Sequence, residues 1–134
     1  MAGQLRLRVV TPSRQVLEAQ VDEVRLPGVL GEIGVLPGHT PLLTSLATGP
    51  LTYFARGRGE RLVIQGGCAE VQPEAVTVLA RLAESAEEVD LESARDDARA
   101  AEAALKSATA DELEEVATRL RLAQTRIEVA AAAR

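Results

Sequence analysis

The distribution of glycine and proline divides this chain into two parts. All ten glycines and all six prolines lie before residue 74, and the 50 residues from 85 to 134 contain neither. Glycine and proline mark turns, and both are unfavourable inside helices. The sequence therefore predicts a turn-rich module built of strands, followed by an uninterrupted helical module.

Short apolar runs separated by turn signals fill the first part. Leu5, Leu7 and Val9 alternate with polar residues, which is the period of a half-buried strand. Further strand-like runs are Val21–Leu26, Leu42–Leu46, Leu51–Ala55, Leu62–Ile64, Cys68–Gln72 and Val76–Ala80. Many short strands at spacings of about 8–12 residues are typical of antiparallel sandwiches and barrels.

The pattern changes to helical spacing at about Ala83. Apolar residues then recur at steps of three and four residues, as in the buried stripe of an amphipathic helix. The residues of this stripe are Leu91, Ala94, Ala98, Ala101, Leu105 and Ala108, followed by Leu113, Val116, Leu120, Ala123, Ile127 and Ala130. We therefore expect two helices that each bury one face.

Capping signals set the expected ends of these helices. Asp90 is a candidate N-cap for the first helix, and Thr109 followed by Glu112 fits a capping box for the second. Because the connection at Ser107–Thr109 is short, the two helices should run antiparallel as a hairpin.

The first half of the helical stripe consists mostly of alanine. Alanine favours helix but buries little surface, at roughly 25 cal/mol per Å² of apolar area. The hairpin should therefore be held only weakly, against itself and against the first module. Two interpretations stay open: a hairpin that moves, and a static hairpin that lies on the sandwich.

The predicted fold is α+β, with an N-terminal antiparallel β-sandwich in residues 1–84 and a C-terminal antiparallel two-helix hairpin in residues 85–134. The formal net charge is -5, and it follows this division. Residues 1–84 hold eight basic and eight acidic residues, whereas residues 85–134 hold seven and twelve. An acidic chain with only two aromatic residues argues against a nucleic-acid binder, which needs a basic surface and stacking rings.

The sequence does not predict a membrane-spanning segment. Residues 33–55 carry no formal charge, but three prolines, three glycines and five Ser/Thr residues within them argue against a spanning helix. The first ten residues lack the apolar core of a signal peptide. We expect any membrane association to pass through a partner. The single cysteine, Cys68, excludes an internal disulfide and is compatible with a reducing cytosol.

No catalytic constellation stands out. A Cys/His dyad would require both His39, the single histidine, and Cys68, and a structural role for Cys68 in a strand is the favoured interpretation. One histidine without a cysteine cluster gives no metal site. The Gly31–Gly34 segment lacks the lysine and the following helix of a phosphate-binding loop. We therefore predict no catalytic residues, no metal and no cofactor.

The segment Leu26–Leu51 is the most distinctive part of the chain. Its glycines and prolines predict a tightly turned loop, on which Glu32 and His39 place polar groups. This favours a shaped docking surface, and the alternative is that these residues only build turns.

This segment resembles the signature of the epsilon subunit of the bacterial F-type ATP synthase. The matching residues are Gly31-Glu32-Ile33-Gly34-Val35-Leu36-Pro37-Gly38-His39-Thr40-Pro41-Leu42-Leu43, then Gly49-Pro50-Leu51, Gly66-Gly67-Cys68-Ala69-Glu70-Val71 and Val76-Thr77-Val78-Leu79-Ala80. The resemblance covers the whole chain, including the order of sandwich and hairpin.

The resemblance implies a non-catalytic rotor subunit of a proton-translocating complex. In that family the sandwich binds the gamma subunit and the ring of c subunits, and helps to couple proton flow to ATP synthesis on the beta subunits. The family is peripheral to the cell membrane, on the cytoplasmic side in bacteria, without direct membrane insertion. Glu32, Gly34 and His39 match the stretch that faces the polar loops of the c-ring, and are expected to contact it.

The resemblance also implies a regulatory hairpin. In the family this hairpin can be folded down or extended along gamma, and the extended state inhibits ATP hydrolysis. Arg119, Arg121 and Arg126 would then meet acidic surface on the alpha and beta catalytic subunits. The alternative for these arginines is plain solvent exposure.

One departure concerns nucleotide binding. Some family members bind ATP through a motif of the form Ile/Leu-Asp-x-x-Arg-Ala, which aligns with residues 89–94 here. Asp90 and Ala94 match, but Ser93 replaces the arginine. Arg95 lies two residues on, roughly 200° around the helix, and cannot simply substitute. We therefore expect ATP to bind weakly or not at all.

Two interpretations from other classes compete with the rotor subunit. A small enzyme or ligand-binding sandwich with a helical lid would need clustered polar residues in a pocket, where the sequence offers only His39, Cys68 and scattered carboxylates. A generic adaptor would use the hairpin to join a coiled coil.

Overall fold

A computed structural model describes residues 3–132. The strands are β1 (Leu5–Val10), β2 (Gln15–Val21), β3 (Glu23–Gly28), β4 (Gly31–Val35), β5 (Leu42–Ser45), β6 (Gly49–Ala55), β7 (Arg58–Gln65), β8 (Cys68–Val71), β9 (Ala75–Leu79) and β10 (Leu82–Ser85). A 3-10 turn, η1 (Ala86–Glu88), leads to helices α1 (Leu91–Leu105) and α2 (Ala110–Ala132).

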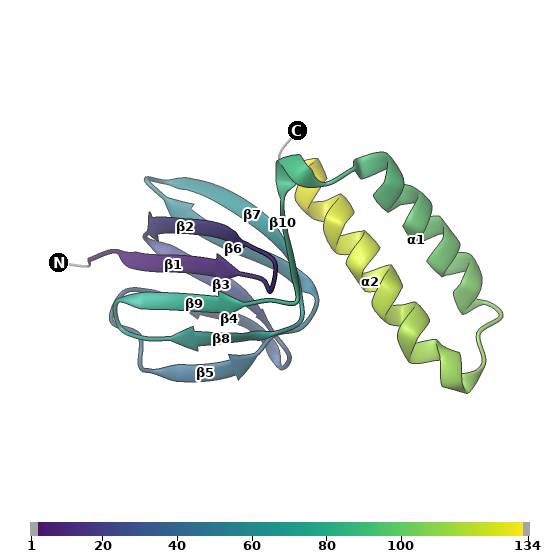
Figure 1. Cartoon of the computed structure of the whole chain (residues 1–134), viewed down its shortest axis with the longest axis horizontal. Helices are drawn as coiled ribbons and strands as arrows, with labels where there is room; N and C mark the ends of the chain where they lie inside the picture. The colour runs from purple at the N-terminus through teal and green to yellow at the C-terminus, as the bar shows by residue number, and fades with distance from the viewer. Residues whose placement is uncertain (1–2, 133–134) are drawn as a thin grey trace.

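The strands form a sandwich of two five-stranded sheets (Figure 1). The first sheet has the order β2-β1-β9-β8-β5, and the second has the order β10-β7-β6-β3-β4. The expected sandwich is confirmed, and it is antiparallel with one exception. Strand β9 lies parallel to β1, with Leu7 opposite Val76 and Val9 opposite Val78.

The sandwich core lies between the inner faces of the two sheets. On β1 the alternation predicted from the sequence is confirmed, because Leu5, Leu7 and Val9 are fully buried. From the second sheet Leu26 and Leu51 are also fully buried within the same cluster. Every strand except β5 buries at least one residue, and the opposite face of each sheet is left to meet a partner or the hairpin.

Three strands were not predicted from the sequence. Strand β2 is an edge strand with only one fully buried residue, Val21, so it lacks a clear alternation. Strand β4 occupies Gly31–Val35, where the sequence indicated a turned loop, and pairs with β3. Strand β10 ends at Ser85, so helical structure begins later than the expected change at Ala83.

The helical hairpin matches its prediction closely. Asp90 caps α1 through a hydrogen bond of 3.1 Å from the backbone N–H of Ser93 to its carboxylate. At the second helix, the Glu112 carboxylate accepts hydrogen bonds from the backbone N–H and the hydroxyl of Thr109, at 3.0 and 3.1 Å. This is one half of the expected capping box.

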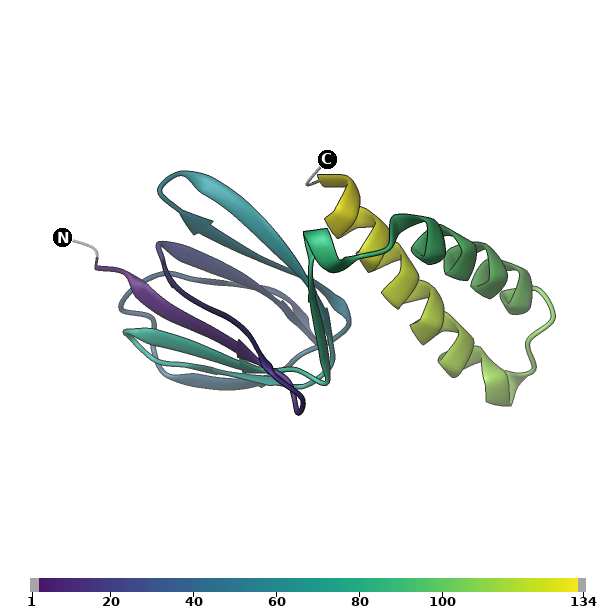
Figure 2. The same ribbon diagram turned by 45° about the horizontal axis from the view of Figure 1, so that its top comes forward.

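The hairpin lies on the outer face of the second sheet and then projects away from it (Figures 1 and 2). Helix α2 lies between the sandwich and α1, and contacts β6, β7 and η1. A second, smaller core joins the two modules and contains Val63, Ala86, Val89, Ala94, Val129 and Ala130. Between the helices, Ala98 and Ala101 of the predicted stripe are buried, as are Val116 and Ala123. The structure is therefore that of a hairpin folded against the sandwich by its C-terminal turns.

Within residues 3–132, neither helix combines the length and the apolar character that a bilayer span requires.

Candidate functional site

The turn between β3 and β4 presents the most exposed apolar side chain of the described residues. Gly28 and Gly31 are paired, so only Val29 and Leu30 form the loop. Leu30 is fully exposed, and Val29 is 56% exposed. A Cβ on Gly28 would lie 2.7 Å from the Gly31 carbonyl oxygen, so this tight turn requires glycine there. Leu30 was not predicted from the sequence, although an apolar pair flanked by two glycines is a recognisable signal of an exposed turn.

The three residues expected to contact a ring of partner subunits do not form one cluster. Glu32 and Gly34 alternate on the outer, exposed face of the edge strand β4, close to the Leu30 turn. His39 lies beyond the opposite end of this strand, where its Nδ1 is 2.7 Å from the Thr40 carbonyl oxygen. There Gly38 donates a hydrogen bond to the Pro73 carbonyl, in the turn between β8 and β9.

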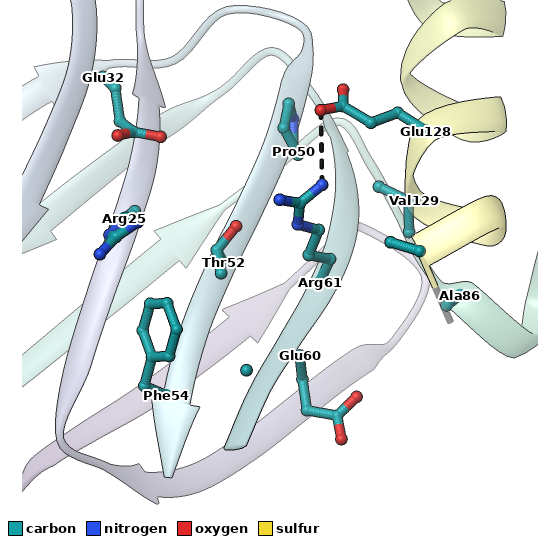
Figure 3. A pocket seen from close by; sticks show the side chains of 12 residues that line it. Arg25, Glu32, Pro50, Thr52, Phe54, Glu60, Arg61, Ala86, Glu128 and Val129 are labelled. Atoms are coloured by element: carbon teal, nitrogen blue, oxygen red, sulfur yellow. Dashed lines mark hydrogen bonds and ion pairs between the residues drawn. The ribbon is translucent and has the colours of Figure 1, made fainter. Parts of the chain in front are cut away.

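Glu32 also lines a hollow of about 340 Å³ between the second sheet and α2 (Figure 3). Charged residues of both signs line this hollow. The Arg61 Nη1 lies 3.4 Å from the Glu128 carboxylate of α2, and the Arg25 guanidinium stacks 4.8 Å from the centre of the Phe54 ring. The hollow therefore lies at the interface between the sandwich and the hairpin.

The outer face of the first sheet carries a second apolar surface. Leu43 on β5 is 73% exposed and Leu79 on β9 is 52% exposed, with the half-buried Cys68 of β8 between these two strands. On the side of β9 away from β8, Val10 of β1 is paired with Leu79. We call Val10, Leu43, Cys68 and Leu79 the outer patch. On the same face the exposed Glu70 of β8 lies directly opposite Leu43. No element of residues 3–132 covers the outer patch, and large exposed apolar side chains on an uncovered sheet face indicate a docking surface.

Two of the three candidate arginines of α2 bind the sandwich in this structure. The Arg121 Nε donates to the Thr48 carbonyl at 3.1 Å. Arg126 forms a bidentate pair with Glu84 of β10, at 2.8 and 3.2 Å. Arg119 is exposed and lies with Arg126 and Asp97 around a small hollow between the helices.

The residues aligned with a nucleotide-binding motif have structural roles. Asp90 is the N-cap of α1, and its carboxylate accepts the amide hydrogen of Ser93. Ala94 is fully buried in the second core. The side-chain oxygen of Asp90 is thus engaged by the start of its own helix.

The geometry does not assemble the dyad that His39 and Cys68 could have formed. Cys68 begins β8, whereas His39 lies beside the turn that follows the other end of β8, a separation of roughly 14 Å at strand rise. Among residues 3–132, no group of three or more His, Cys, Asp or Glu side chains could hold a metal ion.

Groups with shifted pKa values lie apart from one another. Burial, together with Glu60 and Glu87, raises the pKa of Tyr53. Hydrogen bonds from Arg14 and from the Ser85 amide lower the pKa of Glu88. The Thr109 amide lowers the pKa of Glu112. These shifts follow from a partly buried ring and two capping carboxylates, which is a structural pattern.

Comparison with known proteins gives a consistent result. The family model described as "ATP synthase, Delta/Epsilon chain, beta-sandwich domain" matches residues 4–86. The ATP synthase epsilon chain of Geobacter sulfurreducens is 48% identical over 106 residues, which cover 79% of this chain and 77% of that protein. The ATP synthase epsilon chain of Carboxydothermus hydrogenoformans is 50% identical over 95 residues, which cover 71% of each chain.

A similar chain is present in the solved structure of the Euglena gracilis mitochondrial ATP synthase, described as OSCP/F1/c-ring in rotational state 1. It superposes with a TM-score of 0.83 at 25% identity, over 98% of this chain and 83% of that chain. The match therefore spans both the sandwich and the hairpin.

Proposed function

This chain belongs to the delta/epsilon chain family of the ATP synthase, as an epsilon subunit, and we propose that it is a non-catalytic part of the rotor. In this role it couples proton flow through the c-ring to ATP synthesis. The observation that carries this proposal is the division of surfaces on one sandwich. The outer face of the first sheet carries the uncovered outer patch, and the outer face of the second sheet carries the hairpin.

The outer patch is the surface that we assign to the gamma subunit. Leu43 and Leu79 are more than half exposed on a sheet face, and burying them against a partner would be favourable at roughly 25 cal/mol per Å². Gamma must hold this subunit firmly while the rotor turns, and apolar contact supplies an attraction that salt does not screen.

The Leu30 turn with Glu32 and Gly34 is the surface that we assign to the c-ring. A fully exposed leucine beside a carboxylate offers both an apolar and a polar contact. His39 lies past the far end of β4, a strand of roughly 17 Å. If His39 is also a c-ring contact, the ring surface must extend along this entire sandwich edge.

The hairpin is the regulatory element, and we assign it the inhibition of ATP hydrolysis. Arg119, Arg121 and Arg126 would contact acidic surface of the alpha and beta subunits when the hairpin extends. The division of labour is then a docking domain in residues 1–84 and a regulatory domain in residues 85–134. Membrane association, on the cytoplasmic side in bacteria, would come from these partners.

Co-purification with gamma tests the docking assignment. We expect the full chain to retain gamma and the Leu43→Asp variant to lose at least about 90% of it, because a charge would be desolvated at the interface. Leu113→Asp is the matched control, since Leu113 is a half-exposed leucine on α2 outside the outer patch, and should retain gamma fully. Equal gamma retention by both variants would reject the outer patch, and no retention by the folded parent chain would reject the proposed function.

A further inference from the structure

The Arg126 side chain pairs with two carboxylates of its own chain. Its Nε and Nη2 donate to the two oxygens of Glu84, at 2.8 and 3.2 Å. Its Nη1 lies 3.7 Å from the Asp97 carboxylate. Each nitrogen of the guanidinium thus faces an acidic group, and three elements, β10, α1 and α2, meet at this one side chain.

This ion pair is the least exposed of those that join the hairpin to the sandwich. The Arg126 and Glu84 side chains are 18% and 20% exposed. The Arg61–Glu128 pair at the same interface is 39% and 50% exposed, and has a single contact of 3.4 Å. Bidentate geometry and partial burial both strengthen a charge-assisted hydrogen bond, whereas exposed pairs contribute little.

The apolar contacts around the pair are modest. The second core consists of three alanines and three valines, with partly buried leucines and an isoleucine against it. Because alanine buries little surface, a strong polar contact makes up a large share of the docking energy of such a hairpin.

We propose that the Arg126–Glu84 pair is a latch that keeps the hairpin folded against the sandwich and that withholds the bidentate Nε/Nη2 fork of Arg126 from any other acidic partner. The Nε/Nη2 fork cannot form a bidentate pair with an external carboxylate while it holds both oxygens of Glu84. Folded and extended states therefore compete for the same fork of Arg126, and release of Glu84 must precede any bidentate contact of this fork with the catalytic subunits. This last consequence rests on the proposed function, whereas the latch itself does not.

A buried thiol can report on the latch in the isolated full-length chain. Val129 is fully buried in the second core, so a Val129→Cys thiol reacts only when the hairpin leaves the sheet. Cys68→Ser removes the single native thiol. In this background the labelling rate with a thiol reagent measures the undocked fraction.

We expect Glu84→Gln to raise the labelling rate roughly 10-fold, because hydrogen bonds to charged groups contribute the corresponding free energy. Arg126→Lys keeps the charge but not the bidentate fork, and should give an intermediate increase. Glu128→Gln is the matched control at the same interface and should change the rate less than about twofold.

A double-mutant cycle identifies the pair as the cause. If the latch exists, Glu84→Gln combined with Arg126→Gln labels no faster than the faster single variant, because one contact cannot be lost twice. The latch proposal would be overturned if the two substitutions had additive effects on the labelling rate. It would also be overturned if Glu84→Gln and Arg126→Lys both labelled at the rate of the parent chain.

The assembled complex separates the latch from the regulatory role. Faster labelling of Glu84→Gln together with lower ATP hydrolysis by the complex supports both. Faster labelling with unchanged hydrolysis supports the latch and rejects the inhibitory role of the hairpin. Unchanged labelling rejects the latch, whatever the hydrolysis rate.

Discussion

The Asp90 carboxylate accepts a hydrogen bond of 3.1 Å from the backbone amide of Ser93 and so begins helix α1. In the alignment expected from the sequence, these two residues match the aspartate and the arginine positions of a nucleotide-binding motif. In this structure the Asp90 carboxylate caps helix α1, and the Ser93 side chain has no positive charge that could bind a phosphate. The structure therefore gives both residues a role without nucleotide.

We predict that the isolated chain does not bind ATP in the micromolar range. A phosphate would need an arginine near Asp90, and Arg126, on the other helix, is held by Glu84 and Asp97. Titration calorimetry with Mg-ATP should give only heats of dilution. A saturable micromolar isotherm would contradict the prediction.

The capping role of Asp90 predicts a cost for its removal. Asp90→Ala should destabilise the chain by about 1 kcal/mol, because the first turn of α1 loses its acceptor. Thermal unfolding should show this as a decrease in Tm of roughly 3–5 °C. Glu102→Ala, at an exposed position in the last turn of the same helix, is the control and should leave Tm within about 2 °C. Equal decreases in the two variants would show that general helix charge, and not the cap, is responsible.

Glu88 makes part of the stability depend on pH. The Arg14 guanidinium, followed by the Ser85 amide, holds the pKa of Glu88 below its ordinary value of 4.5. A carboxylate whose pKa is lowered by folding stabilises the protein above its unfolded pKa, and this contribution is lost as the pH falls through the folded value.

Glu88→Gln should therefore lower Tm at about pH 7 by a few degrees, and this difference should shrink as the pH falls below 4.5. The neighbouring exposed Glu87 provides the control variant Glu87→Gln, which we expect to change Tm by less than about 2 °C. A Glu88→Gln difference that persists unchanged in acid would argue against the ion pair with Arg14.

Val63 provides a test of how separable the two modules are. It is fully buried on the outer face of β7, in the second core, so Val63→Ala should weaken hairpin docking by about 2 kcal/mol. Urea unfolding can be followed by helical circular dichroism and by the fluorescence of Tyr53, the single tyrosine, which packs against the sandwich core. We expect the helical transition to move to lower urea while the Tyr53 transition stays in place.

Val78→Ala is the matched comparison, because Val78 is equally buried but lies in the sandwich core. Its effect should appear in the Tyr53 transition. If both probes shift together for Val63→Ala, the hairpin and the sandwich unfold as one unit.

The helical hairpin could be predicted from the sequence because its signals are local. Each signal can be recognised within one or two helical turns. These signals are an apolar period of three and four residues, a capping aspartate, and the absence of glycine and proline. The structure confirms Asp90 as the cap and buries Ala94, Ala98 and Ala101 of the stripe.

The edge strands could not be predicted because their signals are not local. Strands β2 and β4 each bury only one residue fully, so the two-residue period is faint, and the glycines of β4 indicate turns. Pairing with a neighbouring strand defines them, and that pairing depends on the whole fold.

The site shows the same limit. Glu32 and His39 were expected to act together because they are close in the sequence. Strand β4 separates them, so they lie at opposite ends of the sandwich edge. Arg126 was identified as a functional side chain, whereas its partner Glu84 lies 42 residues away. Glu84 is brought to Arg126 only because α2 packs on β6 and β7, beside β10. Charge alone does not indicate which carboxylate an arginine will meet.

ATP hydrolysis by the assembled complex tests most directly the claim that a docked sandwich carries an inhibitory hairpin. Two complexes are compared, one with the full chain and one with a chain that ends at Glu88, which keeps the sandwich, η1 and the Arg14–Glu88 pair. We predict that both chains assemble with gamma and that the shortened one gives severalfold faster hydrolysis. Equal hydrolysis rates, with both chains fully incorporated, would contradict the account.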